Sequence, residues 1–437
     1  MNTATEAVSL KRVVGVGALG LNIVNLTIAS GIFGLPAIIS AMLGHAAVIA
    51  YFVCAVLFGL VGLCFAEAGS RVGSGGGLYA YASVPFGPIV GGIAGTMLWL
   101  AAGASASAAI VNLLVDTLSA VVPALGGAWV RPVIILALFA IVAVVNIRGV
   151  RYGVRLSVLM TIVKIAPLVL LVVVGVFYID PVELRWTELP SIKSIGEASV
   201  ILFYAFIGIE CALSVSGEVV RPSRTVPRAI LMGLLIIAAL YVGLQLVAQG
   251  TLGDAIKDSK APLVESARVV FGSWGGILLA VCMSLSASGC IASDVLSTPR
   301  VPFAIAQQGQ LPRQIASVHP RFGTPYVAII LYAVICAGLA LSGSFKQLAI
   351  ISSSGTLVLY LICCLGVLKL RAQKIATEGE AFVAPGGPVV PVLAAAIIVW
   401  MLSTLSRQEL VSVLVVVAVL AVAYAVVARR NASSHRP

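Results

Sequence analysis

The chain has 437 residues, of which 60% are hydrophobic and only 10% are charged, and its mean hydropathy is +1.13. Soluble domains average about 45–50% apolar and about 25% charged residues, so this composition excludes a soluble enzyme, a disordered chain and a small disulfide scaffold. The net charge of +11 comes from basic residues that stand singly or in small groups between apolar blocks. This placement favours a role in membrane topology and argues against nucleic-acid binding.

Twelve apolar blocks follow a short polar N-terminus at 1–12, and a membrane-spanning helix needs roughly 17–25 such residues. The blocks lie at 13–40, 45–70, 86–115, 131–147, 155–178, 197–219, 228–250, 273–298, 326–343, 347–368, 389–405 and 408–428. The first block is too long for the core of a signal peptide, so we expect it to stay in the protein as a span. The composition and these blocks predict an all-α integral membrane protein whose partner is the lipid bilayer, ending in a tail at 429–437.

Twelve spans place both ends of the chain on the same side of the membrane. The two ends and the loops on their side carry 18 of the 27 Lys and Arg residues, whereas the opposite loops carry 8. Because Lys and Arg accumulate in cytoplasmic segments, we expect both termini to be cytoplasmic and the protein to lie in a bacterial inner (plasma) membrane.

Two blocks contain residues that interrupt a helix at mid-membrane depth. The first carries Ser30, Gly31 and Pro36 near its middle, and the sixth carries Gly208 two residues before Glu210. Unwound backbone is tolerated in a membrane only where it is buried in protein or lines a watery cavity. Ordinary packing of small residues between helices is the alternative interpretation of either block taken alone.

The two interruptions fall in the first helix of two successive groups of five. Interrupted helices in matching positions are typical of transporters built from inverted repeats. We therefore expect a first five-helix repeat at 13–178, a second, inverted repeat at 197–368, and two peripheral helices at 389–428.

Three ionisable side chains lie inside predicted spans: Lys164 near the middle of the fifth, Glu210 in the sixth and Asp294 well along the eighth. Each costs roughly 2.5–3.5 kcal/mol on insertion-based scales, so a functional role is the default hypothesis. The alternatives are that Lys164 reaches the membrane surface, that Glu210 forms a structural pair and that Asp294 lies at the interface.

The interrupted backbone offers binding groups of two kinds. Free N–H groups at Ser30 and Gly31 suit a substrate carboxylate, and carbonyls near Thr27 and between Tyr204 and Ile207 suit an ammonium group. A zwitterionic amino acid carries both partners. The eight cysteines show no metal or disulfide spacing, and the three histidines fall in loops, at the edge of a block or in the tail, so we expect neither a cofactor nor a metal.

At these positions the sequence resembles the amino acid–polyamine–organocation (APC) superfamily of permeases. The stretch Ala29-Ser30-Gly31-Ile32-Phe33-Gly34-Leu35-Pro36 is similar to the motif of the family's first helix, and Phe203 to Glu210 is similar to its sixth. Further similarity lies at Asn146 to Arg151, at Glu218 to Arg228, at Gly309 to Pro312 and at His319 to Pro325. The resemblance implies twelve transmembrane helices, with a LeuT-type 5+5 core plus two peripheral helices, and transport by alternating access.

The resemblance also implies roles for individual residues. Ser30 and Gly31 match positions whose N–H groups hold the substrate carboxylate, and Thr27 and Ile207 match positions whose carbonyls hold the amine. Tyr204 matches an aromatic gate. Glu210 matches a glutamate implicated in coupling, and Lys164 matches a lysine that replaces a sodium ion in many relatives. Because burial disfavours the charged form of a lysine, Lys164 could also release a proton during the cycle. We therefore expect sodium-independent, proton-coupled transport with Lys164 and Glu210 as the coupling residues.

Asp294 departs from the family pattern, because relatives usually carry an aromatic residue there that faces the substrate. A carboxylate at this position would either favour a basic substrate or pair with Lys164. The leading hypothesis is a secondary amino-acid transporter working by proton symport or exchange, and the alternative is a polyamine or basic-amino-acid antiporter. An enzyme or a channel is disfavoured, and both a monomer and a homodimer remain open.

Overall fold

The computed structural model describes residues 14–72, 77–148, 154–186, 188–212, 219–307, 311–375 and 382–434. The polar N-terminus at 1–12 and the end of the tail at 435–437 lie outside these residues. Within the described ranges the regular elements are helices, apart from an isolated bridge between Val14 and Val219.

The helices follow the apolar blocks of the sequence. Those of the first half are α1 (Val16–Thr27), α2 (Leu35–Leu43), α3 (Val48–Val72), α4 (Gly77–Phe86), α5 (Pro88–Met97), α6 (Ser105–Val121), α7 (Val130–Ile147) and α8 (Val154–Gly175). Those of the second half are α9 (Ile192–Phe203), α10 (Ile209–Ala212), α11 (Pro222–Leu252), α12 (Pro262–Phe271), α13 (Ser273–Ser297), α14 (Arg300–Gln307), α15 (Tyr326–Ser342) and α16 (Phe345–Ala372). Two final helices are α17 (Val389–Ser403) and α18 (Arg407–Ser434), so α18 continues into the residues expected to form the tail.

The described residues include six helical stretches long and apolar enough to cross a membrane: Val48–Val72, Pro88–Val121, Val130–Ile147, Arg224–Asp258, Ser273–Gln307 and Phe345–Ala372. Shorter apolar helices accompany them at Val16–Thr27, Leu35–Ala46, Lys164–Tyr178, Tyr326–Ser342 and Val389–Ser403. The chain is therefore a multi-pass, all-helical membrane protein.

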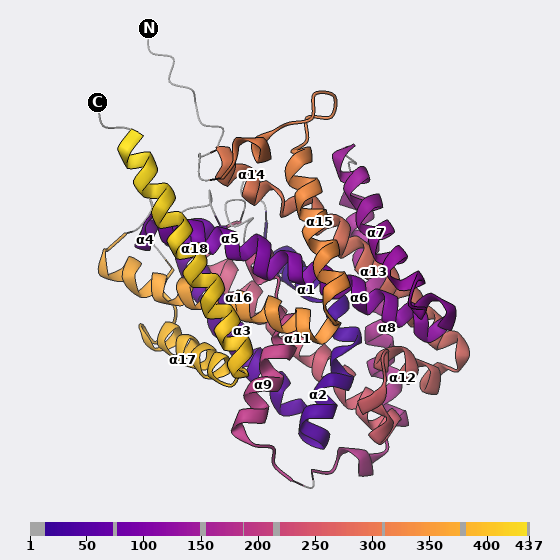
Figure 1. Ribbon diagram of the computed structural model, residues 1–437. Helices are drawn as coiled ribbons and strands as arrows, with labels where there is room; N and C mark the ends of the chain where they lie inside the picture. Colours follow the sequence, from indigo (N-terminus) through magenta and orange to yellow (C-terminus); the bar gives the residue numbers. More distant parts are fainter. Residues whose placement is uncertain are drawn as a thin grey trace.

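The helices form two packed groups, and α16 contacts both of them. In one group α11 packs against α1 and α3, and α9 packs against α2 and α3. In the other, α13 packs against α6, α7 and α8, and α15 packs against α6 and α7. Helix α16 contacts α3 and α9 of the first group and α6 of the second. Along the long axis of the molecule, α14 and the C-terminal end of α18 lie at one end, and the segment before α9 lies at the other (Figure 1).

One transmembrane stretch is not a regular α-helix. The predicted span at 86–115 is built from α5 and α6, and the seven residues between them, Leu98–Ala104, form a π-helical turn. Helix α16 packs against this turn, and the Ser352 hydroxyl donates to the Ala102 carbonyl oxygen at 2.9 Å. Such π turns are rare and often lie at functional sites.

Candidate substrate site

The first interruption lies between α1 and α2. Helix α1 ends at Thr27, Ile28 leaves helical geometry (φ −73°, ψ 86°) and Ala29 is extended (φ −103°, ψ −175°). A single 3-10 turn at Ser30–Phe33 follows, and α2 begins at Leu35 with Pro36 in its first turn. Proline is favourable there because the first N–H groups of a helix have no partner within it. The break therefore exposes N–H groups at the start of the 3-10 turn and carbonyls at the end of α1.

The second interruption lies between α9 and α10. Helix α9 ends at Phe203, a 3-10 turn follows at Tyr204–Phe206, and Ile207 is extended (φ −70°, ψ 140°). Gly208 then adopts φ 135°, and α10 begins at Ile209. A side chain at Gly208 would strain the backbone, because residues other than glycine rarely adopt a positive φ.

The two interruptions touch one another. A Cβ atom placed on Gly208 would lie 2.7 Å from the Leu26 carbonyl oxygen and 3.2 Å from the Thr27 Cα atom. The hydroxyl group of Tyr241, on α11, lies 3.1 Å from the Thr27 carbonyl oxygen and 2.9 Å from the Ala205 carbonyl oxygen. A single buried hydroxyl therefore bridges the unwound ends of α1 and α9, a role that the sequence did not predict.

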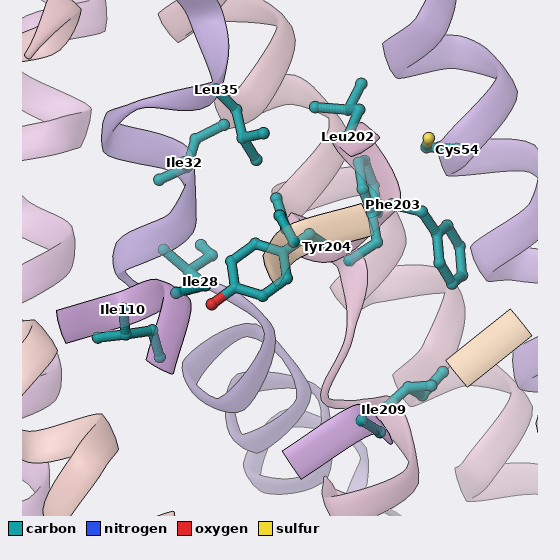
Figure 2. Close-up of a cluster of buried hydrophobic side chains, with 14 of the residues drawn as sticks. Ile28, Ile32, Leu35, Cys54, Ile110, Leu202, Phe203, Tyr204 and Ile209 are labelled. Carbon is teal, nitrogen blue, oxygen red and sulfur yellow. The ribbon is translucent and has the colours of Figure 1, made fainter. Parts of the chain in front are cut away.

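Tyr204 covers the start of the first 3-10 turn. A Cβ atom on Gly31 would lie 2.7 Å from the Tyr204 Cε1 atom, so the ring rests on the backbone at a position that only glycine leaves open. The Tyr204 hydroxyl donates to the Ala106 carbonyl oxygen at 2.8 Å, and Phe345 meets the ring edge to face at 5.8 Å. Figure 2 shows the ring beside Ile28, where the α1 ribbon is unwound. Tyr204 and Gly31, both predicted site residues, thus lie in direct contact.

Thr27 and Ile207 lie at the two breaks, as the predicted site requires. The Thr27 carbonyl oxygen accepts the Ala29 N–H at 2.8 Å in addition to the Tyr241 hydroxyl. The Thr27 side chain is fully buried, and its hydroxyl has no hydrogen-bond partner in the part of the chain that the structure describes. An amine that binds this carbonyl would therefore compete with donors that are already present.

Lys164 connects α8 to the end of α1. Its ammonium group donates a hydrogen bond to the Asn25 carbonyl oxygen, two residues before α1 ends. Helix α8 packs against α13 as well. A carbonyl partner offsets part of the cost of placing an ammonium group inside the membrane.

Glu210 faces α16, and among the described residues it forms no ion pair. Its carboxylate accepts a hydrogen bond from the Tyr360 hydroxyl and another, at 3.1 Å, from the Gly208 N–H. Tyr360 is fully buried and meets Phe65 and Phe203 edge to face, with ring centroids 5.1 and 5.8 Å apart. The carboxylate of the second break is thereby held against α16 by a fixed aromatic hydroxyl.

Asp294 is separate from both of these charges. Its carboxylate accepts hydrogen bonds from hydroxyl groups on α6, α15 and its own chain segment, and the ion pairs found among the described residues do not join it to Lys164. The same part of the chain holds no group of three His, Cys, Asp or Glu side chains close enough to bind a metal ion. The structure thus brings the predicted residues of the two breaks together and leaves Asp294 in a cluster of its own.

A further charged cluster lies at the end of α3. The Glu67 carboxylate is fully buried and binds Arg371 of α16 through two hydrogen bonds of 2.7 and 2.5 Å. Arg71 donates to Glu67 at 3.0 Å, and the N–H of Ala384 donates at 2.8 Å. Arg71 is four residues from Glu67, a spacing at which side chains on one helix meet, whereas Arg371 is 304 residues away. This cluster ties the segment before α17 to the end of α3.

Comparisons with known proteins identify the family. The family model for amino acid permeases matches residues 16–428. The serine/threonine exchanger SteT of Bacillus subtilis is 29% identical over 399 residues, which cover 90% of each chain. From the same organism, the branched-chain amino acid permease BcaP is 26% identical over 97% of this chain and 94% of its own, and a methylthioribose transporter is 25% identical over 99% and 96%. The resemblance found in the motifs is confirmed: the chain belongs to the amino acid permease family.

Proposed function

We propose that the protein is a secondary active transporter that moves neutral amino acids across the membrane by alternating access, without sodium, through proton symport or exchange. The observation that carries the proposal is the contact between two interrupted helices, α1–α2 and α9–α10, each unwound at its centre. Half-helix ends that meet in this way present N–H groups to an anion and carbonyls to a cation. The same arrangement supports twelve spans in a 5+5 inverted repeat with two peripheral helices.

In the proposed complex, the N–H groups of Ser30 and Gly31 hold the substrate carboxylate. The carbonyls of Thr27 and Ile207 receive the ammonium group. Tyr204 acts as the gate, because its ring lies against Gly31 and must move before a carboxylate can reach the backbone there.

A neutral substrate fits the two carboxylates better than a basic one. The Glu210 Oε2 atom accepts from Tyr360 and from the Gly208 N–H, and Asp294 accepts from three hydroxyl groups, so a distal cation that bound at these oxygens would compete with donors already in place. Leaving such donors without a partner would cost binding energy. Two of the relatives bear names that refer to neutral amino acids, namely serine and threonine for one and branched-chain amino acids for the other.

Lys164 supports the absence of sodium dependence. Its ammonium group donates to the end of α1 from α8, which also packs against α13. A fixed cation at this position supplies the charge that a bound sodium ion would supply.

Both termini are proposed to be cytoplasmic, in agreement with the excess of Lys and Arg on their side of the chain. The C-terminal end of α18 and α14 share one end of the molecule, as this orientation requires (Figure 1). Accessibility of single cysteines introduced near the end of α18, tested with a membrane-impermeant reagent in intact cells and in inverted vesicles, checks the assignment.

The decisive experiment is uptake into proteoliposomes with radiolabelled L-serine and L-valine. We expect saturable uptake that accelerates when the same amino acid is loaded inside, and unchanged rates when choline replaces sodium. Competition with L-arginine and putrescine should be weak. A strict sodium requirement would overturn the role of Lys164, and uptake restricted to arginine or putrescine would replace the neutral-substrate proposal with the basic-substrate antiporter.

A further inference from the structure

We propose that Asp294 is the proton-binding site of the transporter, and that it controls Tyr204 through Ser107. This inference rests on the proposed proton-coupled transport and goes beyond it, because it places the coupling proton at a carboxylate outside the two helix breaks.

The Asp294 carboxylate lies in a cluster of hydroxyl groups from α6, α15 and the end of α13. One of its oxygens, Oδ2, accepts from Ser107 at 2.6 Å and from Tyr332 at 2.5 Å, and the other, Oδ1, accepts from Thr298 at 2.5 Å. Ser107 and Tyr332 are 1% and 0% exposed. The cluster thus joins two buried hydroxyl groups, from α6 and α15, with the half-buried Thr298 at the end of α13, and each donates the one hydrogen that its hydroxyl carries.

The π-helical turn makes room for this cluster. A Cβ atom on Gly103 would lie 2.9 Å from the Tyr332 hydroxyl oxygen and 3.1 Å from the Thr298 Cγ2 atom. The glycine in the turn at Leu98–Ala104 therefore lets α6 approach α13 and α15 closely enough for Ser107 to reach the carboxylate.

The ionisable groups that face Asp294 do not neutralise it. Helix α15 contributes Tyr332 and Cys336, and the turn after α9 contributes Tyr204. Helix α6 and the π turn contribute hydroxyl and apolar side chains. On the other elements packed against α13, Lys164 donates to Asn25, Arg300 donates to the Leu296 carbonyl, and the acid of α6, Asp116, pairs with Arg131 of α7 at 2.5 Å. Among the described residues, no cation lies within 4.0 Å of the Asp294 carboxylate.

A carboxylate held by neutral donors inside a membrane is a natural proton acceptor. The ionised form can use all three hydroxyl hydrogens, and binding a proton from water removes the charge. A proton bound at Oδ2 gives that oxygen an O–H bond and leaves it room for one donor, so one of the two hydroxyls bonded there must stop donating to it and can accept the new O–H instead. We assign this change to Ser107. The proton returns to water on the opposite side when the ionised form is restored.

Ser107 connects this change to the substrate site. It follows Ala106, whose carbonyl oxygen accepts the Tyr204 hydroxyl at 2.8 Å, and Tyr204 covers Gly31. Release of Ser107 frees the α6 turn that anchors Tyr204. Protonation of Asp294 therefore favours movement of the ring away from Gly31, and a substrate that displaces the ring favours protonation in return, since coupling between two sites is reciprocal.

The test compares Asp294→Asn with Asp116→Asn, which changes a carboxylate on α6 that has an arginine partner. Proteoliposomes receive radiolabelled L-serine and L-valine, either under an inward proton gradient or as exchange without a gradient. We expect gradient-driven accumulation by Asp294→Asn to fall at least tenfold, while its exchange stays within about twofold of the wild type. Asp116→Asn should match the wild type in both assays. Gradient-driven accumulation by Asp294→Asn at the wild-type level would overturn the inference.

A second variant, Tyr332→Phe, keeps the carboxylate and removes one donor. Because one hydrogen bond to the charged form is lost, the midpoint of the pH profile of uptake should move to higher pH by roughly half to one unit. An unchanged profile would overturn the inference even if Asp294→Asn failed to exchange. A wild-type protein that ignores the proton gradient would instead refute proton coupling itself, so the two failures are distinguishable.

Discussion

Substitution of Gly208 by alanine tests the contact between the two helix breaks. The residue has φ 135°, and a Cβ atom there would meet the Leu26 carbonyl oxygen at 2.7 Å. The unusual backbone conformation costs about 1–3 kcal/mol for a residue other than glycine. Because the obstructing atom belongs to the backbone, the overlap adds about 1–3 kcal/mol. The variant should therefore weaken the conformation in which α1 and α9 touch by about 2–6 kcal/mol.

Each 1.4 kcal/mol changes an equilibrium about tenfold, so amino-acid exchange should fall about 30-fold or more. The assay is exchange of radiolabelled L-serine and L-valine in proteoliposomes, normalised to the amount of monodisperse protein. The matched control is Gly289→Ala on α13, where a Cβ atom would have no neighbour within 4 Å and the backbone is helical. Exchange by Gly208→Ala within twofold of the wild type would refute the reasoning.

Three further substitutions test the contacts of Tyr241, of Lys164 and of the charged cluster at the end of α3. Tyr241→Phe should lower the stability of the folded protein by about 1–3 kcal/mol, because a buried carbonyl loses its donor. A thermal unfolding scan in detergent measures the change, and an unchanged midpoint would show that the hydroxyl does not join the two helices. Lys164→Ala should abolish proton-driven uptake while the protein still inserts, and wild-type uptake would remove the lysine from the mechanism. Glu67→Gln should destabilise the protein by about 3–5 kcal/mol, because Arg371 then loses its buried partner. The same unfolding scan measures it, with Lys193→Ala, whose ion pair is exposed, as the control. A shift of the midpoint smaller than that of the control would contradict the prediction.

The positions of the helices were largely predictable because membrane spans are encoded locally. An apolar block must satisfy its own backbone as a helix, so its place along the chain depends on composition alone. The breaks were predictable for a related reason. Glycine and proline in the middle of a block, as at Gly31 and Gly208, disfavour a helix through their own backbone properties, whatever packs against them.

The partners of the buried charges were not predictable from one sequence. Ser107 and Asp294 are 187 residues apart, and Glu67 and Arg371 are 304 apart, so nothing in the local pattern connects them. The π turn at Leu98–Ala104 was missed for the same reason, because its backbone is shaped by the helices packed against it.

One missed residue did leave a signal. Tyr241, Gln245 and Gln249 recur every four residues in the otherwise apolar α11 and so share one face of it. The structure shows this polar face buried: Gln245 accepts from Tyr51 at 2.9 Å and donates to Ser40 at 2.8 Å. Periodic polar residues within an apolar helix therefore mark its buried side.

The Thr27 carbonyl oxygen already accepts two hydrogen bonds, one from the Ala29 N–H and one from the Tyr241 hydroxyl, and this affects what substrate binding can do. On the proposed mode of binding, an incoming ammonium group competes with the Tyr241 hydroxyl, the same hydroxyl that fastens α1 to α9. The ligand would then release α1 from α9 by replacing the hydroxyl group that joins them. Without a ligand the two helices would stay joined and the carrier would not change conformation, which is the behaviour expected of an obligatory exchanger. A conformational change of the empty carrier would require some other trigger.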